Sequence, residues 1–482
     1  MDKKRDMLMK RKKQVSPDEA EKESDTSLYE KKDQPSNIKM GFWLASSGSR
    51  ALSDSVLSPF IPLYGKSLGA SSVQIGFIVS ITSLLSIFQL LWAYLAQKFN
   101  LSRAFAIISA YVSSIFSFIL LPIKNIYLFA SMRGLYSITL SATLPTSSNL
   151  FAERTPPKSW PLRNSLIQGV LVVGTLIGTL VGGLLLWKIP TNLGFPIIFI
   201  CGGGISIISA VFFHIAIPSK KKLESKGRWY QIEEVDFTLS NTLATMKTDK
   251  NFVIFCFVNL IFIFGVNLSA PFFIIFNTTY YDLTIFQTAL LTSIGLIPQT
   301  IFSILTAKLI ERTRKKELVI VAGIFTSFFP IFFMIPSLAG RLTNVFWILI
   351  IIWSFNGIAW GIINSSLTTL LLDIIHPRRR TLQLAINNSI SAIALFIAPI
   401  LGGLIIEKTS TIYVILIISA SLRFIGALLF GLVKEPVIGG TILRPIQRVI
   451  PYIVRSNSER GVTILTMVNS VKRGKIRNKK EK

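Results

Sequence analysis

Twelve long apolar runs, separated by short polar segments, dominate the hydrophobic pattern of this chain. Each run is about 20 residues or longer, which is enough for a helix to cross roughly 30 Å of hydrocarbon. Backbone groups in lipid must find their hydrogen-bond partners within their own segment, so the runs are predicted to be helices. The predicted spans are 41–64, 71–96, 103–122, 126–151, 163–187, 193–217, 251–277, 284–310, 317–336, 344–373, 381–406 and 411–433.

The two halves of this pattern repeat each other. From the end of the first span into the second, the chain reads S-P-F-I-P-L-Y-G-K-S-L-G-A-S-S-V-Q-I-G (58–76). From the end of the seventh span into the eighth, it reads A-P-F-F-I-I-F-N-T-T-Y-Y-D-L-T-I-F-Q-T (270–288). Each segment has a proline-marked helix end, a turn and a glutamine that opens the next span. A duplicated membrane chain predicts a solute pathway between its halves.

The composition supports a membrane protein. The chain of 482 residues is 51% hydrophobic and 16% charged, with a mean hydropathy of +0.56. Charged residues make up roughly a quarter of an ordinary soluble chain. The polar parts are an N-terminal tail (1–40) expected to be disordered, a linker (218–250) and a basic C-terminal tail (434–482).

The positive charges indicate an orientation. Lys and Arg, 51 in all, concentrate in the two tails and in the loops on the tails' side. This bias predicts a multi-pass protein of the cell membrane with both termini in the cytoplasm. The net charge of +27 therefore reflects topology, and no nucleic-acid partner is expected. The stretch 442–482 mixes Ile, Val and Leu with Lys and Arg, which predicts contact with anionic lipid.

Enzymatic chemistry is not expected. The chain has no G-x-x-x-x-G-K-[ST] phosphate-binding loop, and its two cysteines, Cys201 and Cys256, suggest neither a disulfide framework nor a metal site. No nucleophile–base set stands out in the spans. We therefore expect no catalytic residues, cofactor or metal.

Two loops at equivalent places carry a family resemblance. They read A-Y-L-A-Q-K-F-N-L-S-R (93–103) and A-K-L-I-E-R-T-R-K-K (307–316), and both resemble the G-x-x-x-D-R-x-G-R-K loop of the major facilitator superfamily. Alanine replaces the first glycine in both copies, and the acid is Gln97 in the first copy and Glu311 in the second. The fourth span, with Arg133 in S-M-R-G-L-Y, resembles the family's fourth-helix arginine motif.

The resemblance covers roughly residues 41–435 and implies a fold. That fold is an all-α membrane protein of twelve transmembrane helices in two pseudo-symmetric six-helix bundles, 41–217 and 251–433. It further implies alternating access to a central cavity lined mainly by the first, fourth, seventh and tenth helices. The gating-loop residues implied in this way are Gln97, Arg103, Glu311, Arg312 and Lys315.

Small residues four apart mark two further helices. The fifth span contains G-T-L-I-G-T-L-V-G-G (174–183) and the eleventh contains A-P-I-L-G-G (398–403). Such residues let helix backbones approach closely. Close packing of helices is a sufficient explanation for these residues. The family resemblance implies that the same packing also serves the rocking of the two bundles during alternating access.

Polar residues within the spans indicate the pathway, because they are costly in lipid and tend to face the protein interior. On the first span, Arg50 and Asp54 share one face. On the tenth, tryptophan and asparagine at helical spacing suit a small organic solute, although packing is the alternative. The expected pathway residues are Arg50, Asp54, Arg133, Tyr136, Asn267, Asn356, Trp360 and Asn364.

Three charged residues are expected to form a cluster. Asp54 and Arg133 both fall roughly 10–14 Å below the outer surface at 1.5 Å per residue, and Arg50 lies one turn from Asp54. An arginine keeps a nearby carboxylate ionised, so a carboxylate that changes partners can take up and release protons. The alternative is a static ion pair between the first and fourth helices. Two arginines against one acid also favour an anionic solute.

We expect the protein to be a secondary active transporter that moves a small organic solute and is coupled to protons. We expect it to be a monomer. One alternative is a multidrug exporter of the same fold, with a broad substrate range. Another is a non-transporting membrane sensor or assembly protein whose tails and linker carry the function. Broad dye export would identify the first alternative, and loss of function on removal of the tails would identify the second.

Overall fold

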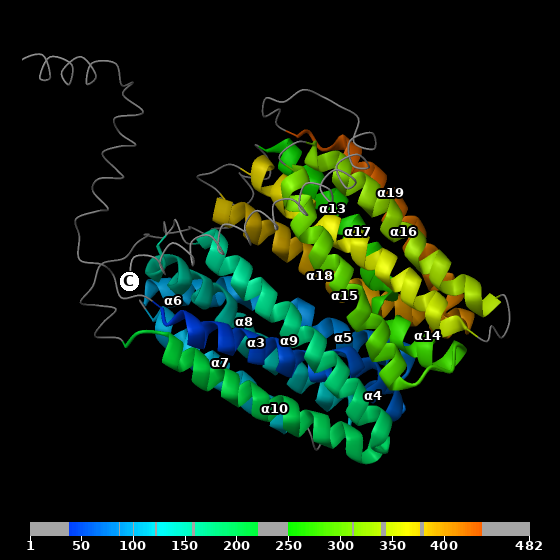
Figure 1. Cartoon of the computed structure of the whole chain (residues 1–482), viewed down its shortest axis with the longest axis horizontal. Helices are drawn as coiled ribbons and strands as arrows, with labels where there is room; N and C mark the ends of the chain where they lie inside the picture. Colours follow the sequence, from blue (N-terminus) through cyan, green and yellow to red (C-terminus); the bar gives the residue numbers. More distant parts are fainter. Residues whose placement is uncertain are drawn as a thin grey trace, which may run out of the picture. The chain divides into compact units, whose positions relative to one another are not determined.

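The computed structural model describes residues 38–85, 87–99, 101–120, 123–156, 160–219, 249–310, 313–338, 344–375 and 380–435. The predicted tails and linker therefore lie largely outside the described residues. Within these ranges the chain is helical and contains no β-strand (Figure 1). The described helices, in chain order, are α3 (Met40–Leu57), η1 (Ser58–Phe60), α4 (Ile61–Ser67), α5 (Ser72–Leu85), α6 (Phe88–Lys98), α7 (Ser102–Ile119), α8 (Ile126–Arg154), α9 (Trp160–Lys188), α10 (Thr191–Ala216), α13 (Lys250–Ser269), η3 (Ala270–Phe272), α14 (Phe273–Tyr280), α15 (Ile285–Ile310), α16 (Lys315–Leu338), α17 (Val345–Ile374), α18 (Arg380–Thr409), α19 (Tyr413–Leu429) and η5 (Phe430–Leu432).

Each predicted span corresponds to one helix or to two or three consecutive helical segments. Nine helical segments in the described part are long and apolar enough to cross a membrane. The first predicted span is broken at Pro59 into α3, η1 and α4, and the seventh is broken at Pro271 into α13, η3 and α14. Proline has no N–H to donate and its ring clashes with the preceding turn, which explains both breaks.

The sequence repeat is reproduced in local backbone structure. At the start of α5, the N–H of Ser71 donates to Gln74 Oε1 at 2.9 Å and the N–H of Gln74 donates to Ser71 Oγ at 3.3 Å. Thr284 and Gln287 form the same reciprocal pair before α15, at 2.9 and 3.2 Å. These are capping boxes, which satisfy backbone donors that a helix start leaves free. The prediction that a glutamine opens the span after each proline break is confirmed.

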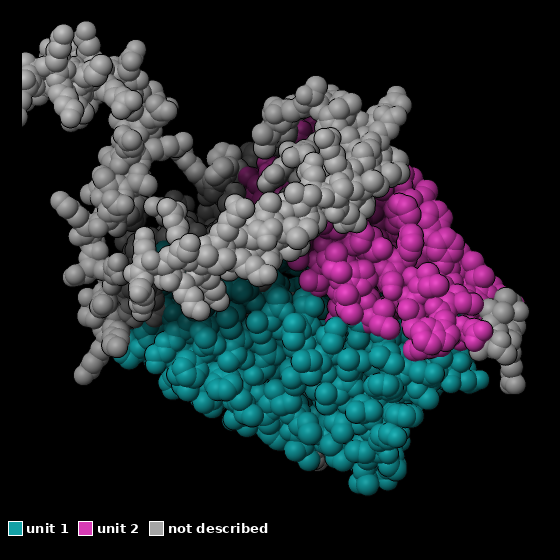
Figure 2. Space-filling model, in the orientation of Figure 1, with its two compact units in different colours: residues 1–242, 267–293, 385–415 teal, residues 243–266, 294–384, 416–482 magenta. Residues whose placement is uncertain are grey.

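The helices form two compact units, coloured in Figure 2. Unit 1 comprises residues 1–242, 267–293 and 385–415, and unit 2 comprises 243–266, 294–384 and 416–482. Unit 1 therefore draws two segments from the second half of the sequence. Its core contains a cluster of aromatic rings. The centroid of the Tyr64 ring lies 4.9–5.3 Å from the ring centroids of Phe129, Phe195 and Phe199.

Glycines of α9 bring it into backbone contact with α3. A Cβ added at Gly174, Gly178 or Gly182 would lie 2.4–2.5 Å from a carbonyl oxygen of α3. These glycines follow one another at four-residue steps, so one ridge of α9 runs along α3. Close approach of this kind requires residues without a side chain. It holds in place the helix that carries Arg50 and Asp54.

Within unit 1, helices from the two halves of the sequence meet at one end, which we call the distal side and define by the turns 67–71 and 281–284. A Cβ on Gly76 would lie 2.2 Å from the carbonyl oxygen of Pro399, so α5 and α18 touch through their backbones. Glu407 Oε1 accepts the N–H of Val73 at 3.0 Å. Lys66 Nζ donates to Thr279 Oγ1 at 2.9 Å. The first and second halves are therefore joined on the distal side.

Unit 2 contains a buried arginine that ties three of its helices together. Arg423 of α19 is 2% exposed and donates to the carbonyl oxygens of Thr326 on α16 (3.3 Å) and Val266 on α13 (3.2 Å). Thr326 lies four residues before Pro330, which has no N–H to give this carbonyl. The guanidinium therefore supplies the donor that the proline removes.

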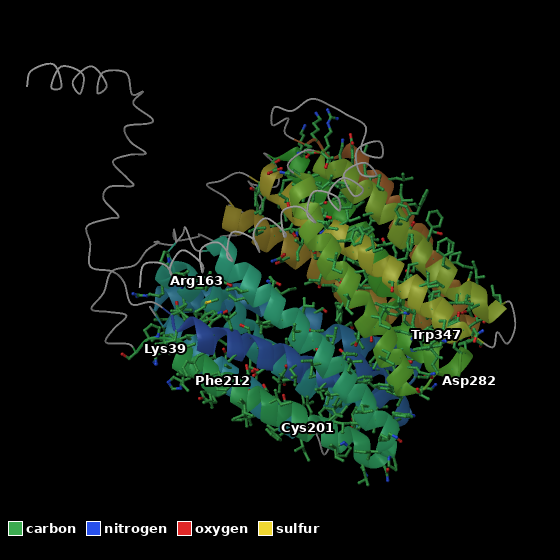
Figure 3. The ribbon with its side chains drawn as sticks, in the orientation of Figure 1. Lys39, Arg163, Cys201, Phe212, Asp282 and Trp347 are labelled. Atoms are coloured by element: carbon green, nitrogen blue, oxygen red, sulfur yellow. The ribbon has the colours of Figure 1, made fainter. Side chains whose placement is uncertain are left out.

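Many large apolar side chains lie on the outside of the described helices. On α10 they include Leu193, Ile200, Ile207 and Ile208, and Cys201 on the same helix is also exposed (Figure 3). Trp347 near the start of α17 is 65% exposed. Apolar faces of this extent match a helix surface in contact with lipid.

Candidate functional site

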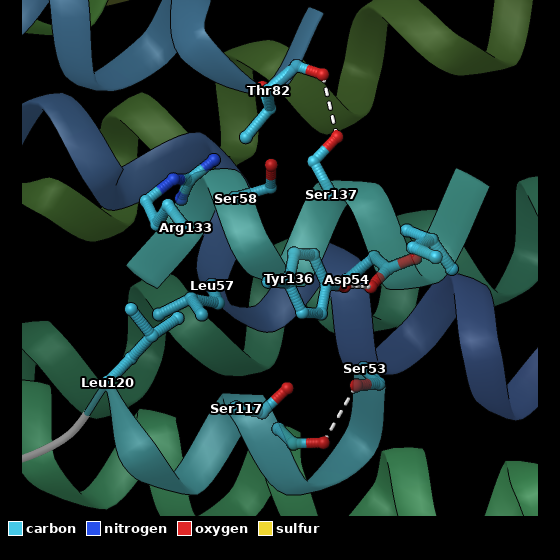
Figure 4. Close-up of a pocket in the computed structure, with 12 residues that line it drawn as sticks. Ser53, Asp54, Leu57, Ser58, Thr82, Ser117, Leu120, Arg133, Tyr136 and Ser137 are labelled. Atoms are coloured by element: carbon cyan, nitrogen blue, oxygen red, sulfur yellow. Dashed lines mark hydrogen bonds between the residues drawn. The ribbon is translucent and has the colours of Figure 1, made fainter. Parts of the chain in front are cut away.

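A cavity of about 230 Å³ lies within unit 1 and is shown in Figure 4. Its walls come from α3, η1, α5, α8 and α10 and from the C-terminal end of α7. The lining residues are Ser53, Asp54, Leu57, Ser58, Thr82, Ser117, Leu120, Arg133, Tyr136, Ser137, Leu140 and Gly202. Charged and hydroxyl groups thus share the cavity with three leucines.

Three of the predicted pathway residues form a connected network. Arg50 Nε donates to Asp54 Oδ2 at 3.1 Å, and its Nη2 donates to the hydroxyl of Tyr136 at 2.7 Å. That hydroxyl donates in turn to Asp54 Oδ1 at 2.9 Å. The carboxylate therefore has a partner on each oxygen, one from its own helix and one from α8. The side chain of Asp54 is 41% exposed and that of Arg50 is 19% exposed, so the carboxylate is the more open of the two.

Two serines hold Arg50 from other helices. Its Nη1 donates to Ser113 Oγ on α7 at 3.3 Å and to Ser206 Oγ on α10 at 3.1 Å. Sequence reasoning did not single out either serine. The signal available was the run of buried serines Ser109, Ser113 and Ser117, which recur every four residues along one face of an otherwise apolar helix.

Arg133 lines the same cavity but joins no part of this network. Its side chain is 9% exposed, and its Nε is buried with no hydrogen-bond partner. It interacts with the charge of Asp54 through space, yet within the described part of the chain no ion pair or hydrogen bond connects the two. The ion pair of this site lies inside α3, between Arg50 and Asp54, and the link from α3 to α8 is the Tyr136 hydroxyl.

The other predicted pathway residues lie on α13 and α17. Asn267, in unit 1, is half-buried. In unit 2, the Trp360 ring lies 6.4 Å from that of Phe262, and Asn356 Oδ1 is buried with no hydrogen-bond partner. Asn364 is exposed. Their contact with a solute remains a prediction.

Two of the predicted gating-loop residues, Arg103 and Lys315, have side-chain contacts in the described part of the structure. Lys315 pairs with Asp373 at the end of α17, and Arg103 Nε donates to the carbonyl of Pro218 at 2.8 Å. Gln97 lies in α6, but its side chain is outside the described part, as are Glu311 and Arg312. Sequence reasoning missed Glu435, whose carboxylate accepts the N–H groups of Lys315 (2.9 Å) and Lys316 (3.2 Å) at the start of α16. A carboxylate at a helix N-terminus is favoured by the free N–H groups and the helix dipole.

Solved structures of similar fold are transporters. The nucleoside transporter NupG is 16% identical, with a TM-score of 0.63 over 82% of this chain and 99% of that one. A POT family transporter in complex with 5-aminolevulinic acid is 11% identical, with a TM-score of 0.66 over 82% and 95%. A bacterial homologue of the human lysosomal transporter Spinster, in an inward-facing and occupied conformation, is 13% identical, with a TM-score of 0.62 over 82% and 96%.

Comparison with curated protein sequences gives no significant match. The family model of the Major Facilitator Superfamily matches residues 44–273 and 255–457, which together span most of the chain. The match includes the helices that carry the cavity, and it agrees with the resemblance of the loop motifs and with the helical fold. The chain is therefore a multi-pass membrane protein that belongs to the Major Facilitator Superfamily.

Proposed function

We propose that the chain is a secondary active transporter that moves a small organic solute by alternating access and couples this movement to protons through Asp54. The observation that carries the proposal is the network of Arg50, Asp54 and Tyr136 at the wall of the unit 1 cavity. Charged groups within membrane spans are expensive and usually mark a substrate or ion path.

The partners of Arg50 support a role for Asp54 as the proton carrier. When a carboxylate takes up a proton, it loses its charge and its hold on the arginine weakens. Arg50 keeps hydrogen bonds to Ser113 and Ser206 in that event, so its charge is not left without partners. The exposed fraction of the Asp54 side chain, 41%, gives water in the cavity access to the carboxylate.

In an alternating-access cycle, the contacts on the distal side would close one of the two access states. We propose that the two bodies that move are the halves 41–217 and 251–433, joined by 218–250, with both termini in the cytoplasm. The contacts of Gly76 with Pro399 and of Val73 with Glu407 then belong to a state that is closed on the distal side. These contacts separate when the distal side opens.

The test uses purified protein in proteoliposomes that contain a pH-sensitive dye. Uridine, dialanine and 5-aminolevulinic acid are suitable first solutes, because the similar structures include a nucleoside transporter and POT family transporters. The monocarboxylates lactate and benzoate complete the set, because the cavity wall carries a second arginine, Arg133. We expect at least one solute to move protons with it. Asp54→Asn should abolish proton movement while solute exchange across the membrane at equal pH persists.

A matched control is Asp282→Asn, which makes the same chemical change in a turn of the distal side. Asp282 has a φ of 51°, a conformation that asparagine tolerates, so the turn should be preserved. Proton-coupled uptake unchanged in Asp54→Asn would refute the coupling role of this carboxylate.

A further inference from the structure

We infer that Arg133 binds the carboxylate of a small monoanionic organic solute in the unit 1 cavity. This inference rests on the proposed transport function and adds the chemical class of the solute. It depends on three observations, which are the unpaired state of Arg133, the pairing of Asp54 with other groups, and the lining of the cavity.

Arg133 is a buried cation that forms no ion pair with the residues that the structure describes. Its side chain is 91% buried, its Nε has no hydrogen-bond partner, and it lines the cavity. Figure 4 shows its side chain among the lining residues. A buried charge without a partner is costly, and an anion that enters the cavity removes much of this cost. A guanidinium offers two parallel N–H donors, which match the two oxygens of a carboxylate.

The charges around the cavity select a monoanion. The carboxylate of Asp54 is already matched by Arg50 and by the Tyr136 hydroxyl. Arg133 therefore adds one positive charge that the described residues of the cavity do not balance. One carboxylate neutralises it, whereas a dianion such as a phosphate ester leaves a net negative charge. A zwitterion brings an ammonium group for which the cavity has no free acid.

The remaining lining favours a small body with few polar groups. The hydroxyls of Ser53 and Ser137 already donate to the carbonyls of Gly202 (2.7 Å) and Thr82 (2.6 Å). Ser58 makes no side-chain hydrogen bond within the described part, so its hydroxyl is free to donate to the solute. The hydroxyls of Thr82 and Ser117 likewise donate to carbonyls of their own helices, those of Val79 (3.0 Å) and Ser113 (3.4 Å). The apolar part of the lining consists mainly of Leu57, Leu120 and Leu140. A monocarboxylate with a short apolar or hydroxylated body fits this arrangement and the cavity volume of about 230 Å³.

The experiment measures thermal stabilisation of the purified full-length protein by matched solutes. Lactate is compared with lactamide and with zwitterionic alanine, benzoate is compared with benzamide, and inorganic phosphate serves as the multiply charged anion. We expect lactate or benzoate to raise the Tm by several degrees at saturating concentration, since a ligand that binds only the folded state stabilises it. The amides, alanine and phosphate should leave it unchanged.

Two variants of Arg133 test the assignment. Arg133→Gln should weaken carboxylate binding at least about 30-fold, because the charge and the paired donors are both lost. Arg133→Lys keeps the charge and should give an intermediate affinity, which also shows that substitution at this position leaves the protein folded. Lys188→Gln removes a positive charge far along the sequence, at the end of α9, and should leave the response to carboxylates intact.

Several outcomes overturn the inference. They are an absence of stabilisation by both carboxylates, equal stabilisation by the amides, and an unchanged response in Arg133→Gln. The result of the carboxylate-binding test can be distinguished from the result of the transport test. Uptake of uridine or dialanine without carboxylate binding keeps the transport function and refutes the role of Arg133. Binding of lactate through Arg133 without any solute movement supports the site and refutes transport.

Discussion

The hydroxyl of Tyr136 lies 2.9 Å from Asp54 Oδ1 and 2.7 Å from Arg50 Nη2, so one phenol on α8 connects both members of an ion pair on α3. An ion pair between residues four apart on one helix does not by itself depend on a second helix. Through Tyr136, the pair becomes sensitive to the position of α8. A movement of α8 relative to α3 therefore changes the partners of the carboxylate.

Replacement of Tyr136 with Phe removes this link and keeps the ring. We expect a loss of about 1.5–3 kcal/mol in stability, the usual range for a hydrogen bond to a charged group, and a shift in the pH at which proton-coupled uptake is half-maximal. Thermal unfolding and the pH profile of uptake measure the two effects. Tyr111→Phe, which removes a hydroxyl near His214, is the control. An unchanged pH profile would argue that the phenol is only structural.

Substitution of Ser206 by Ala should weaken the hold on Arg50 without altering its charge. Ser206 accepts from Arg50 Nη1 and also contacts Ser114 Oγ at 2.7 Å, so it joins α3, α7 and α10. We expect slower proton-coupled uptake and a loss of about 1–3 kcal/mol in stability. Ser421→Ala, at an exposed serine of α19 that bonds only to its own helix, should change neither quantity. Equal effects of the two variants would contradict a specific role for Ser206.

Gly76→Val should open the distal side. A Cβ at this position would lie 2.2 Å from the Pro399 carbonyl, so α5 and α18 have to move apart. We expect Ser58→Cys, placed in a background with Cys201→Ser and Cys256→Ser, to react faster with a membrane-impermeant maleimide applied to intact cells. The reason is that the closed distal state is the one in which Gly76 touches Pro399.

The control for this labelling is Gly204→Val, since a Cβ at Gly204 meets nothing within 4 Å. It makes the same substitution within a span and should leave the labelling rate of Ser58→Cys unchanged. Equal or slower labelling in Gly76→Val would be incompatible with the proposed distal closure.

Arg423→Met should destabilise unit 2 by leaving the Thr326 carbonyl without its donor. We expect a loss of about 1.5–3 kcal/mol, measured as a lower Tm, because the lost hydrogen bonds come from a charged donor in a buried position. Pro330→Ala restores an N–H four residues after Thr326 and should recover part of the stability in the double variant. No recovery would show that the arginine acts chiefly through its other contacts.

Much of the fold follows from local sequence features. The apolar runs predict helices because lipid offers no partners to backbone groups, and the prolines Pro59 and Pro271 break helices at equivalent places because they lack an N–H. Likewise, the serine, threonine and glutamine of the capping boxes bond to backbone groups only three residues away.

The site is predicted less fully. The spacing of Arg50 and Asp54 already places them on one face of a helix, and the shared depth of Asp54 and Arg133 is a sequence property. The sequence did not indicate that the Nε of Arg133 has no hydrogen-bond partner among the described residues, or that Tyr136 bridges α8 and α3. It also did not reveal Glu435 as the cap of α16, because that residue is about 120 positions from the groups it binds.

The sequence by itself determined which segments enter the membrane, where they break and which polar groups share a helix face, since these depend on interactions within a few residues. Only the tertiary structure decided which of those polar groups pair. Ser113 and Ser206 reach Arg50 from helices far apart in the chain, whereas Arg133 lines the cavity without an ion pair to the described residues. Partner choice depends on how each helix is rotated and packed against distant segments, and no short stretch of sequence specifies that.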